Sequence, residues 1–191
     1  MNNIEVFTEQ DRIVNEWKHF TTLIRPYRKK WKEQIEDYEV ITRKNIDNII
    51  TVLPITKDNK IVVIEEFRIP INDTVIWSPA WLCDKQWETI EDAARRELYE
   101  ETWYKPWKMI PAFRTPTSSG MTDEVIDCYI ATECEKVTDI LTLDNAEDIR
   151  VMEIDMRNFN DFIMNYIARW WLVDSKMLGM IWYYNDNNNW Q

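Results

Sequence analysis

Only two glycines occur among the 191 residues of this chain, and this scarcity limits how its turns and helix ends can form. Glycine makes up about 7% of an average soluble chain, so roughly thirteen would be expected at this length. Glycine adopts a positive φ without steric cost, which is why tight turns normally depend on it. The chain instead has eleven tryptophans, and the two counts together match the expected number of glycines.

Several tryptophans stand in polar, turn-like stretches that suit glycine better than an indole ring. These are Trp31, Trp107, Trp170, Trp171 and Trp190. We hypothesise that the cell places glycine where this sequence has tryptophan, because some bacterial lineages read the codon UGA as glycine and other translation tables read it as tryptophan. The alternative is an unusually Trp-rich protein. UGG codons at the eleven positions would exclude the hypothesis.

Length and hydrophobicity set the broad class of the chain. This length suits one domain, with at most a small appended subdomain. Hydrophobic residues make up 45% of the chain, which is enough for a core. No apolar run reaches the roughly 18 residues of a membrane-spanning helix, and residues 1–6 show no secretory signal pattern. We therefore expect a cytoplasmic protein without a membrane contact.

Charge and cysteine content argue against two further classes of function. The net charge of −11 argues against a nucleic-acid partner, which needs a basic surface, and suits a site that gathers divalent cations. The three cysteines and the single histidine, His19, lack the spacing of a zinc site. Buried or bystander thiols in a reducing compartment are the expected state of Cys83, Cys128 and Cys134.

The apolar pattern predicts strands along most of the chain. Residues 1–46 alternate apolar and polar side chains in short runs, which predicts antiparallel strands at 20–24 and 38–42. Two largely buried strands, 49–55 and 61–68, flank a polar turn. Further strands are predicted at 109–113, 125–131 and 149–154.

A helix is predicted over residues 90–102, with Thr89 as its N-cap and Asp92 as a partner in a box-like cap. Residue 103 lies just past its end, where helices often place a left-handed glycine. Trp103 in that conformation would be strained by roughly 1–2 kcal/mol. Two C-terminal helices are expected, at 159–168 and 174–183, and Asn158 or Asn160 is expected to cap the first. A disordered tail is expected at 185–191.

Three glutamates gather on the predicted helix 90–102. Glu97 and Glu101 are four residues apart and share a face, and Glu100 lies beside them. Clustered carboxylates repel one another unless a cation neutralises them. Most pairs of glutamates on a helix form only a solvated acidic face. That interpretation is weaker here, because Glu88, Arg96, Leu98 and Tyr104 stand at fixed spacings around the glutamates that also follow a motif. Hard oxygen ligands select Mg²⁺ or Mn²⁺, ions that bridge diphosphate oxygens and activate water.

With Trp81, Trp87 and Trp103 read as glycine, residues 81–104 resemble the signature box of the Nudix hydrolases. The matching residues are Glu88, Arg96, Glu97, Leu98, Glu100, Glu101 and Tyr104. Six residues instead of the family's five separate Trp81 from Glu88, an insertion that falls in the loop and leaves the helical spacing intact.

The resemblance implies a role for each box residue. Residues matching Glu97 and Glu101 bind the metal, the one matching Glu100 often assists, and the backbone carbonyl matching Ala80 commonly joins them. The positions matching Glu88 and Arg96 hold the loop to the helix. Trp81 and Trp103 occupy the structural glycine positions of the box.

Motifs outside the box are similar to the ADP-ribose pyrophosphatase branch of the family. They lie at residues 52–55, 65–68, 79–80, 119–124, 147–149 and 173–176. In that branch the arginine matching Arg68 approaches the substrate diphosphate. The loop that matches 119–124 lines the substrate pocket, which here implicates Ser119, Gly120, Met121 and Glu124. The branch often has proline at the position of Ser119, so this difference weakens the expectation of strict ADP-ribose selectivity.

The resemblance also implies an acidic residue that positions or deprotonates the attacking water. Within residues 144–148, Glu147 is the first choice and Asp144 the second. A plain surface role for Glu147 stays open.

Together these observations predict an α/β (α+β) fold, a Nudix-type α/β/α sandwich with a mixed sheet. The expected organisation is an N-terminal antiparallel β subdomain at 1–46, a Nudix domain at 47–184 and the tail at 185–191. The resemblance implies metal-dependent hydrolysis of ADP-ribose or a related nucleoside diphosphate sugar to AMP and a sugar phosphate, by a homodimer joined through the N-terminal strands. Alternatives are a GDP-sugar or dinucleotide cofactor as substrate, or a non-catalytic nucleotide-binding protein.

Overall fold

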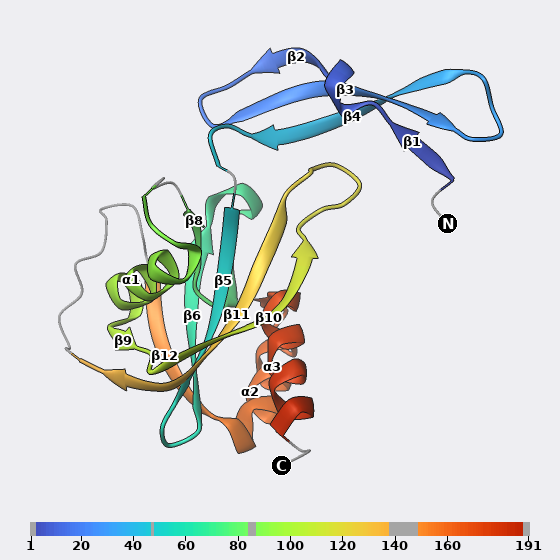
Figure 1. The fold of residues 1–191 in the computed structure, drawn as a ribbon. Helices are drawn as coiled ribbons and strands as arrows, with labels where there is room; N and C mark the ends of the chain where they lie inside the picture. The colour runs from blue at the N-terminus through green and yellow to red at the C-terminus, as the bar shows by residue number, and fades with distance from the viewer. Residues whose placement is uncertain (1–2, 47, 84–86, 138–148, 189–191) are drawn as a thin grey trace. The chain divides into compact units, whose positions relative to one another are not determined.

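The computed structural model describes residues 3–46, 48–83, 87–137 and 149–188 (Figure 1). The chain divides into two compact units, each described here by itself. Unit 1 comprises Met1–Asp47 with Pro116–Val125, and unit 2 comprises Asn48–Thr115 with Ile126–Gln191. The domain boundaries expected from the sequence remain predictions, as does the partner contact of the N-terminal strands. Within the described ranges, no helix is long and apolar enough to cross a membrane.

Unit 1 is a four-stranded antiparallel sheet in which β3 pairs with all three other strands. This confirms the antiparallel strands predicted at 20–24 and 38–42, which lie inside β3 and β4. A short 3₁₀ turn, Thr8–Gln10, connects the first two strands. The strands are β1 (Ile4–Val6), β2 (Arg12–Glu16), β3 (Phe20–Lys29) and β4 (Ile35–Arg43).

Unit 2 is built on a mixed sheet with the strand order β10-β11-β5-β6-β7-β13 (Figure 1). Strands β11 and β5 pair in parallel, as do β13 and β7, while β12, β8 and β9 pair antiparallel with β6, β5 and β11. The strands are β5 (Asn48–Thr56), β6 (Lys60–Arg68), β7 (Asp73–Trp77), β8 (Ala80–Cys83), β9 (Tyr104–Lys105), β10 (Lys108–Pro116), β11 (Val125–Lys136), β12 (Ile149–Asp155) and β13 (Leu172–Val173).

Helices cover both faces of this sheet, because alternate residues of β5 and β6 point to opposite sides. Val52 and Val62 pack with Leu98 of α1 (Ile90–Thr102), and Leu53 and Val63 pack toward the other helices. Those helices are α2 (Phe159–Ile167) and α3 (Ser175–Asn188), which lie together on the face away from α1 (Figure 1). The predicted α/β sandwich with a mixed sheet is confirmed.

Helix α1 begins and ends where the sequence predicted. The Thr89 side chain accepts a hydrogen bond from the Asp92 amide at 3.1 Å and donates one to the Asp92 carboxylate at 2.6 Å. Trp103 ends the helix in the left-handed conformation, with φ 61° and ψ 16°. Trp103 therefore adopts the conformation in which the backbone strain is roughly 1–2 kcal/mol.

Two predictions about the C-terminal helices need correction. Asn158 occupies the predicted N-cap position of α2 but makes no side-chain cap bond. The preceding turn, Met156–Asn158, runs directly into the helix and leaves Asn158 with helical backbone angles, whereas a capping residue is normally extended. The tail is not disordered from residue 185, since α3 continues to Asn188. The Asn187 side chain donates to the Tyr183 carbonyl at 2.7 Å, one turn earlier in the same helix.

Candidate active site

Arg96, at the middle of α1, is the centre of an ion-pair network that extends from Glu88 before the helix to Glu100. Its guanidinium donates to both carboxylate oxygens of Glu88, at 3.0 and 2.9 Å. The same group donates to Glu97 at 2.6 Å and to Glu100 at 2.9 Å. Its bonds to Glu88 and then Glu97 raise the pKa of Arg96 above its ordinary value. Arg96 thus joins the loop before the helix to two of the three clustered glutamates.

The third glutamate, Glu101, lies one turn beyond Glu97, and its Oε2 atom is buried. Leu98 on the inner side of the helix is fully buried against Trp81 of β8, which is 8% exposed. Ala80 precedes Trp81 and pairs with Thr51 of β5. The packing of α1 on β5 and β8 therefore fixes the face on which the glutamates stand.

The donor chemistry of this face fits a hard divalent cation, since all its side-chain ligands are carboxylate oxygens. As placed, however, no three His, Cys, Asp or Glu side chains of the described residues lie close enough together to hold a metal ion. The Arg96 guanidinium supplies the positive charge beside Glu97 and Glu100 instead. A cation at this face would therefore compete with Arg96 for both carboxylates.

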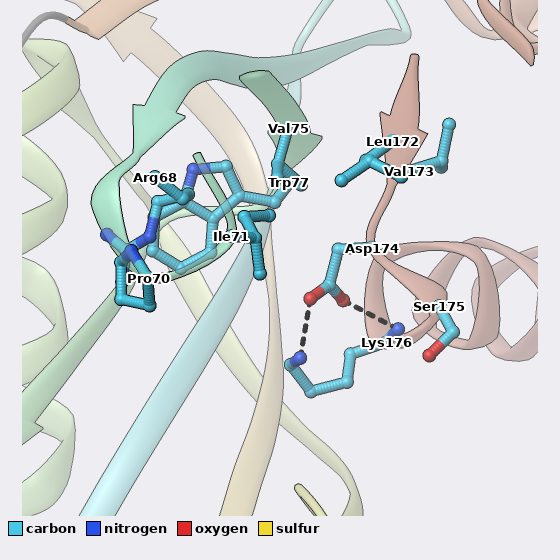
Figure 2. A pocket seen from close by; sticks show the side chains of 10 residues that line it. All are labelled: Arg68, Pro70, Ile71, Val75, Trp77, Leu172, Val173, Asp174, Ser175 and Lys176. Atoms are coloured by element: carbon cyan, nitrogen blue, oxygen red, sulfur yellow. Dashed lines mark hydrogen bonds and ion pairs between the residues drawn. The ribbon is translucent and has the colours of Figure 1, made fainter. Parts of the chain in front are cut away.

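Arg68 ends β6 and lines a pocket of about 540 Å³ (Figure 2). Its guanidinium lies 4.8 Å from the centre of the Trp77 ring and pairs with Glu66 at 2.9 Å. Across the pocket, Asp174 accepts from the Lys176 amide at 2.7 Å and pairs with the Lys176 ammonium (Figure 2). Among the described residues that line this pocket, none comes from α1.

The residues predicted in the 119–124 loop belong to unit 1. Ser119 and Met121 line a second pocket, of about 440 Å³, and the Gly120 carbonyl accepts from the Tyr38 hydroxyl at 3.0 Å. Glu124 pairs with Arg43 at 2.7 Å. Asp144 and Glu147 lie outside the described residues.

Sequence reasoning missed the partners of this loop. Arg43 and Tyr38 were not singled out, because each contacts a residue 81 or 82 positions away. No local pattern marks such a pair. Lys176 stood inside a motif that the sequence analysis noted, but its place on the pocket of Arg68 is visible only in the fold.

Comparison with known proteins assigns the family. The NUDIX domain family model matches residues 47–170. The methanol dehydrogenase activator of Bacillus methanolicus is 32% identical over 134 residues, which span 70% of each chain. The ADP-ribose pyrophosphatase of Bacillus subtilis is 33% identical over 109 residues, which span 57% of this chain and 58% of the relative.

A solved structure shares the fold. The structure described as "Crystal structure of ADP compounds hydrolase" superposes with a TM-score of 0.66 at 15% identity and covers 84% of each chain.

The mixed sheet between helices, with a glutamate-rich helix after a sheet strand, is the architecture of a Nudix hydrolase. The chain belongs to the Nudix family, and the predicted resemblance to its ADP-ribose pyrophosphatase branch is confirmed. Members of the family act on nucleoside diphosphate derivatives and generally use divalent metal ions.

Proposed function

We propose that this enzyme hydrolyses the diphosphate of ADP-ribose or a related nucleoside diphosphate sugar, with AMP and a sugar phosphate as products. The observation that carries the proposal is α1, with Glu97, Glu100 and Glu101 on one helix and Arg96 bonded to two of them. The similarity to the Bacillus subtilis pyrophosphatase supports this choice of substrate.

Mg²⁺ or Mn²⁺ is the proposed cofactor, held by Glu97, Glu101 and Glu100 with the backbone carbonyl of Ala80. When bound, such an ion neutralises diphosphate oxygens and lowers the pKa of a water. Loading such an ion would require Arg96 to give up its bonds to Glu97 and Glu100. Its two bonds to Glu88 would keep the loop before α1 attached to the helix.

Other residues bind the substrate and handle the proton. Arg68 places a positive charge at its pocket, where it neutralises one phosphate of the substrate. Ser119, Gly120 and Met121 are proposed as further substrate-binding residues. Glu147, or Asp144 in its place, accepts the proton of the attacking water as the oxygen–phosphorus bond forms and the diphosphate bridge breaks. A homodimer in the cytoplasm is the proposed state of the protein.

There are two alternative functions for this protein. The first is the same chemistry on a GDP-sugar or a dinucleotide cofactor, which the serine at position 119 favours. The second is a non-catalytic nucleotide-binding protein. Retention of all three glutamates argues against it, because binding alone needs no metal cluster.

Product analysis tests the proposal. The protein is incubated with Mg²⁺ and, in separate reactions, ADP-ribose, GDP-mannose and NADH, and the products are separated by ion-exchange chromatography. AMP and ribose 5-phosphate from ADP-ribose at the highest kcat/KM support the proposal. Faster release of GMP, or of AMP from NADH, would assign the substrate elsewhere, and no product from any substrate would favour the binding protein.

A further inference from the structure

The loop Pro116–Val125 is bound along the outer edge of β4, on the side away from β3. The Tyr38 hydroxyl donates to the Gly120 carbonyl at 3.0 Å, and the Ile41 amide donates to the Met121 carbonyl at 2.9 Å. Ile41 and Thr122 form a parallel bridge. The loop therefore acts as a short extra strand of the unit 1 sheet, which satisfies part of an otherwise open edge.

Two ion pairs hold the end of this loop. Arg43 donates to Glu124 at 2.7 Å, and the two side chains are only 23% and 14% exposed. The Arg43 guanidinium also lies 4.6 Å from the centre of the Phe20 ring, which orients it. Arg25, held by Asp11 at 2.8 Å, reaches Asp123 at 3.3 Å. Pairs shielded to this degree are screened less than exposed ones, so they restrain the loop more strongly.

Glu124 also closes the loop on itself. Its carbonyl accepts from the Thr117 amide at 3.3 Å, and its carboxylate accepts from the Thr117 hydroxyl at 3.3 Å. The Ser118 carbonyl accepts from the amides of Met121 and Thr122, at 2.8 and 2.9 Å. Because one carboxylate bonds to both Arg43 and Thr117, fixing Glu124 fixes the course of the loop between them.

We infer that the N-terminal sheet sets the conformation of the 116–125 loop through Arg43 and Glu124, and that these two are positioning residues which determine substrate affinity. This rests on the proposed function, in which Ser119, Gly120 and Met121 of the same loop contact the substrate. Glu124, which the sequence placed among the substrate contacts, instead acts through the loop, since its carboxylate is engaged by Arg43 and Thr117.

Substitutions of Arg43 and Glu124 distinguish a positioning role in substrate binding from a role in stability alone. Arg43→Gln and Glu124→Gln are each expected to raise KM for ADP-ribose by about 10-fold while kcat changes much less, because a displaced loop weakens positioning. The double variant Arg43→Glu with Glu124→Arg restores the ion pair in reverse but not the bond to Thr117 or the contact with the Phe20 ring, so it is expected to recover part of the affinity. Arg12→Gln is the matched control, since its pair with Asp37 on the same sheet is 61% and 53% exposed.

Hydrogen exchange supplies a readout that does not depend on catalysis. The amides of Met121 and Thr122 should exchange faster in Arg43→Gln than in the native protein and Arg12→Gln. Unchanged exchange, or faster exchange with an unchanged KM, would overturn the inference. If the native protein hydrolyses no ADP-ribose, the proposed function fails separately, and calorimetric affinity for ADP-ribose replaces KM. Equal affinity in all variants, or no binding by the native protein, then overturns the inference as well.

Discussion

At the scale of single residues, asparagine occupies several of the positive-φ positions that glycine would occupy in an ordinary chain. Six non-glycine residues of the described ranges have positive φ, and three are Asn45, Asn59 and Asn72, whose short polar side chain tolerates this conformation. Two of the others, Trp103 and Trp170, are tryptophans at positions where helices and turns usually have glycine.

Two further tryptophans fit their surroundings poorly. The Nε1 atoms of Trp77 and Trp81 are buried, and neither finds a hydrogen-bond partner within the part of the chain that the structure describes. A buried donor left without a partner costs about 1–3 kcal/mol. These positions agree with the hypothesis that glycine is the natural residue, which only the gene can decide.

Trp170→Gly should stabilise the protein by about 1 kcal/mol, because Trp170 holds a left-handed φ that costs a bulky residue more than glycine. Its side chain is 91% exposed, so little packing is lost. Trp182→Gly is the contrast, since residue 182 lies inside α3 and glycine there should destabilise the protein by about 0.5 kcal/mol. Urea denaturation measures both, and equal effects would contradict the conformational argument.

At the scale of elements, the start of α1 is fixed by a side-chain cap. Thr89 satisfies the Asp92 amide, which would otherwise lack a partner within the helix. The helix then runs for 13 residues with Leu98 buried on its inner side.

Thr89→Ala should therefore lower the free energy of unfolding by about 1 kcal/mol, whereas Thr89→Ser should leave it nearly unchanged. The measurement is chemical denaturation followed by circular dichroism. Equal stability of the alanine and serine variants would show that the cap contributes nothing measurable.

Some of these elements could be read from the sequence and some could not. Strands β5, β6, β10, β11 and β12 and helix α1 follow from local patterns, namely apolar runs, a capping threonine and the spacing of the box. The short strands β7, β8, β9 and β13 were not predicted. The bond between Arg43 and Glu124 joins residues 81 positions apart, so it has no local signal. The last turn of α3 lies in an asparagine-rich stretch, which favours turns over helix, so local composition predicted the wrong end. The attachment of Glu97 and Glu100 to Arg96 likewise depends on side-chain placement that spacing alone leaves open.

For the whole molecule, two carboxylates of β12 with a lowered pKa, Glu153 and Asp155, predict that the protein loses stability in acid. The bond from Arg157 lowers the pKa of Asp155 from 3.8 to about 2. The bonds from Lys60 and Tyr104 lower the pKa of Glu153 from its ordinary value of 4.5. Carboxylates with a lowered folded-state pKa stabilise the protein above their unfolded pKa, and this contribution is lost as the pH falls through the folded value.

The urea midpoint of the native protein should consequently fall between pH 4.5 and about pH 2, with little change from pH 7 to pH 5.5 from these two groups. The double variant Asp155→Asn with Glu153→Gln should show a shallower decline over the acid range. A decline as steep as that of the native protein would mean that other carboxylates control acid unfolding.

The central claim is that the glutamates of α1 carry out metal-dependent hydrolysis of a nucleoside diphosphate sugar. Its most direct test is kcat for AMP release from ADP-ribose with Mg²⁺, in the chain as given and in a version with glycine at all eleven tryptophans. In whichever version releases AMP, Glu101→Gln should lower kcat by about 100-fold or more without lowering the melting temperature. Glu91→Gln, which alters an exposed glutamate of the same helix, should leave kcat unchanged. Undiminished AMP release by Glu101→Gln, or no AMP from either version, would contradict the account.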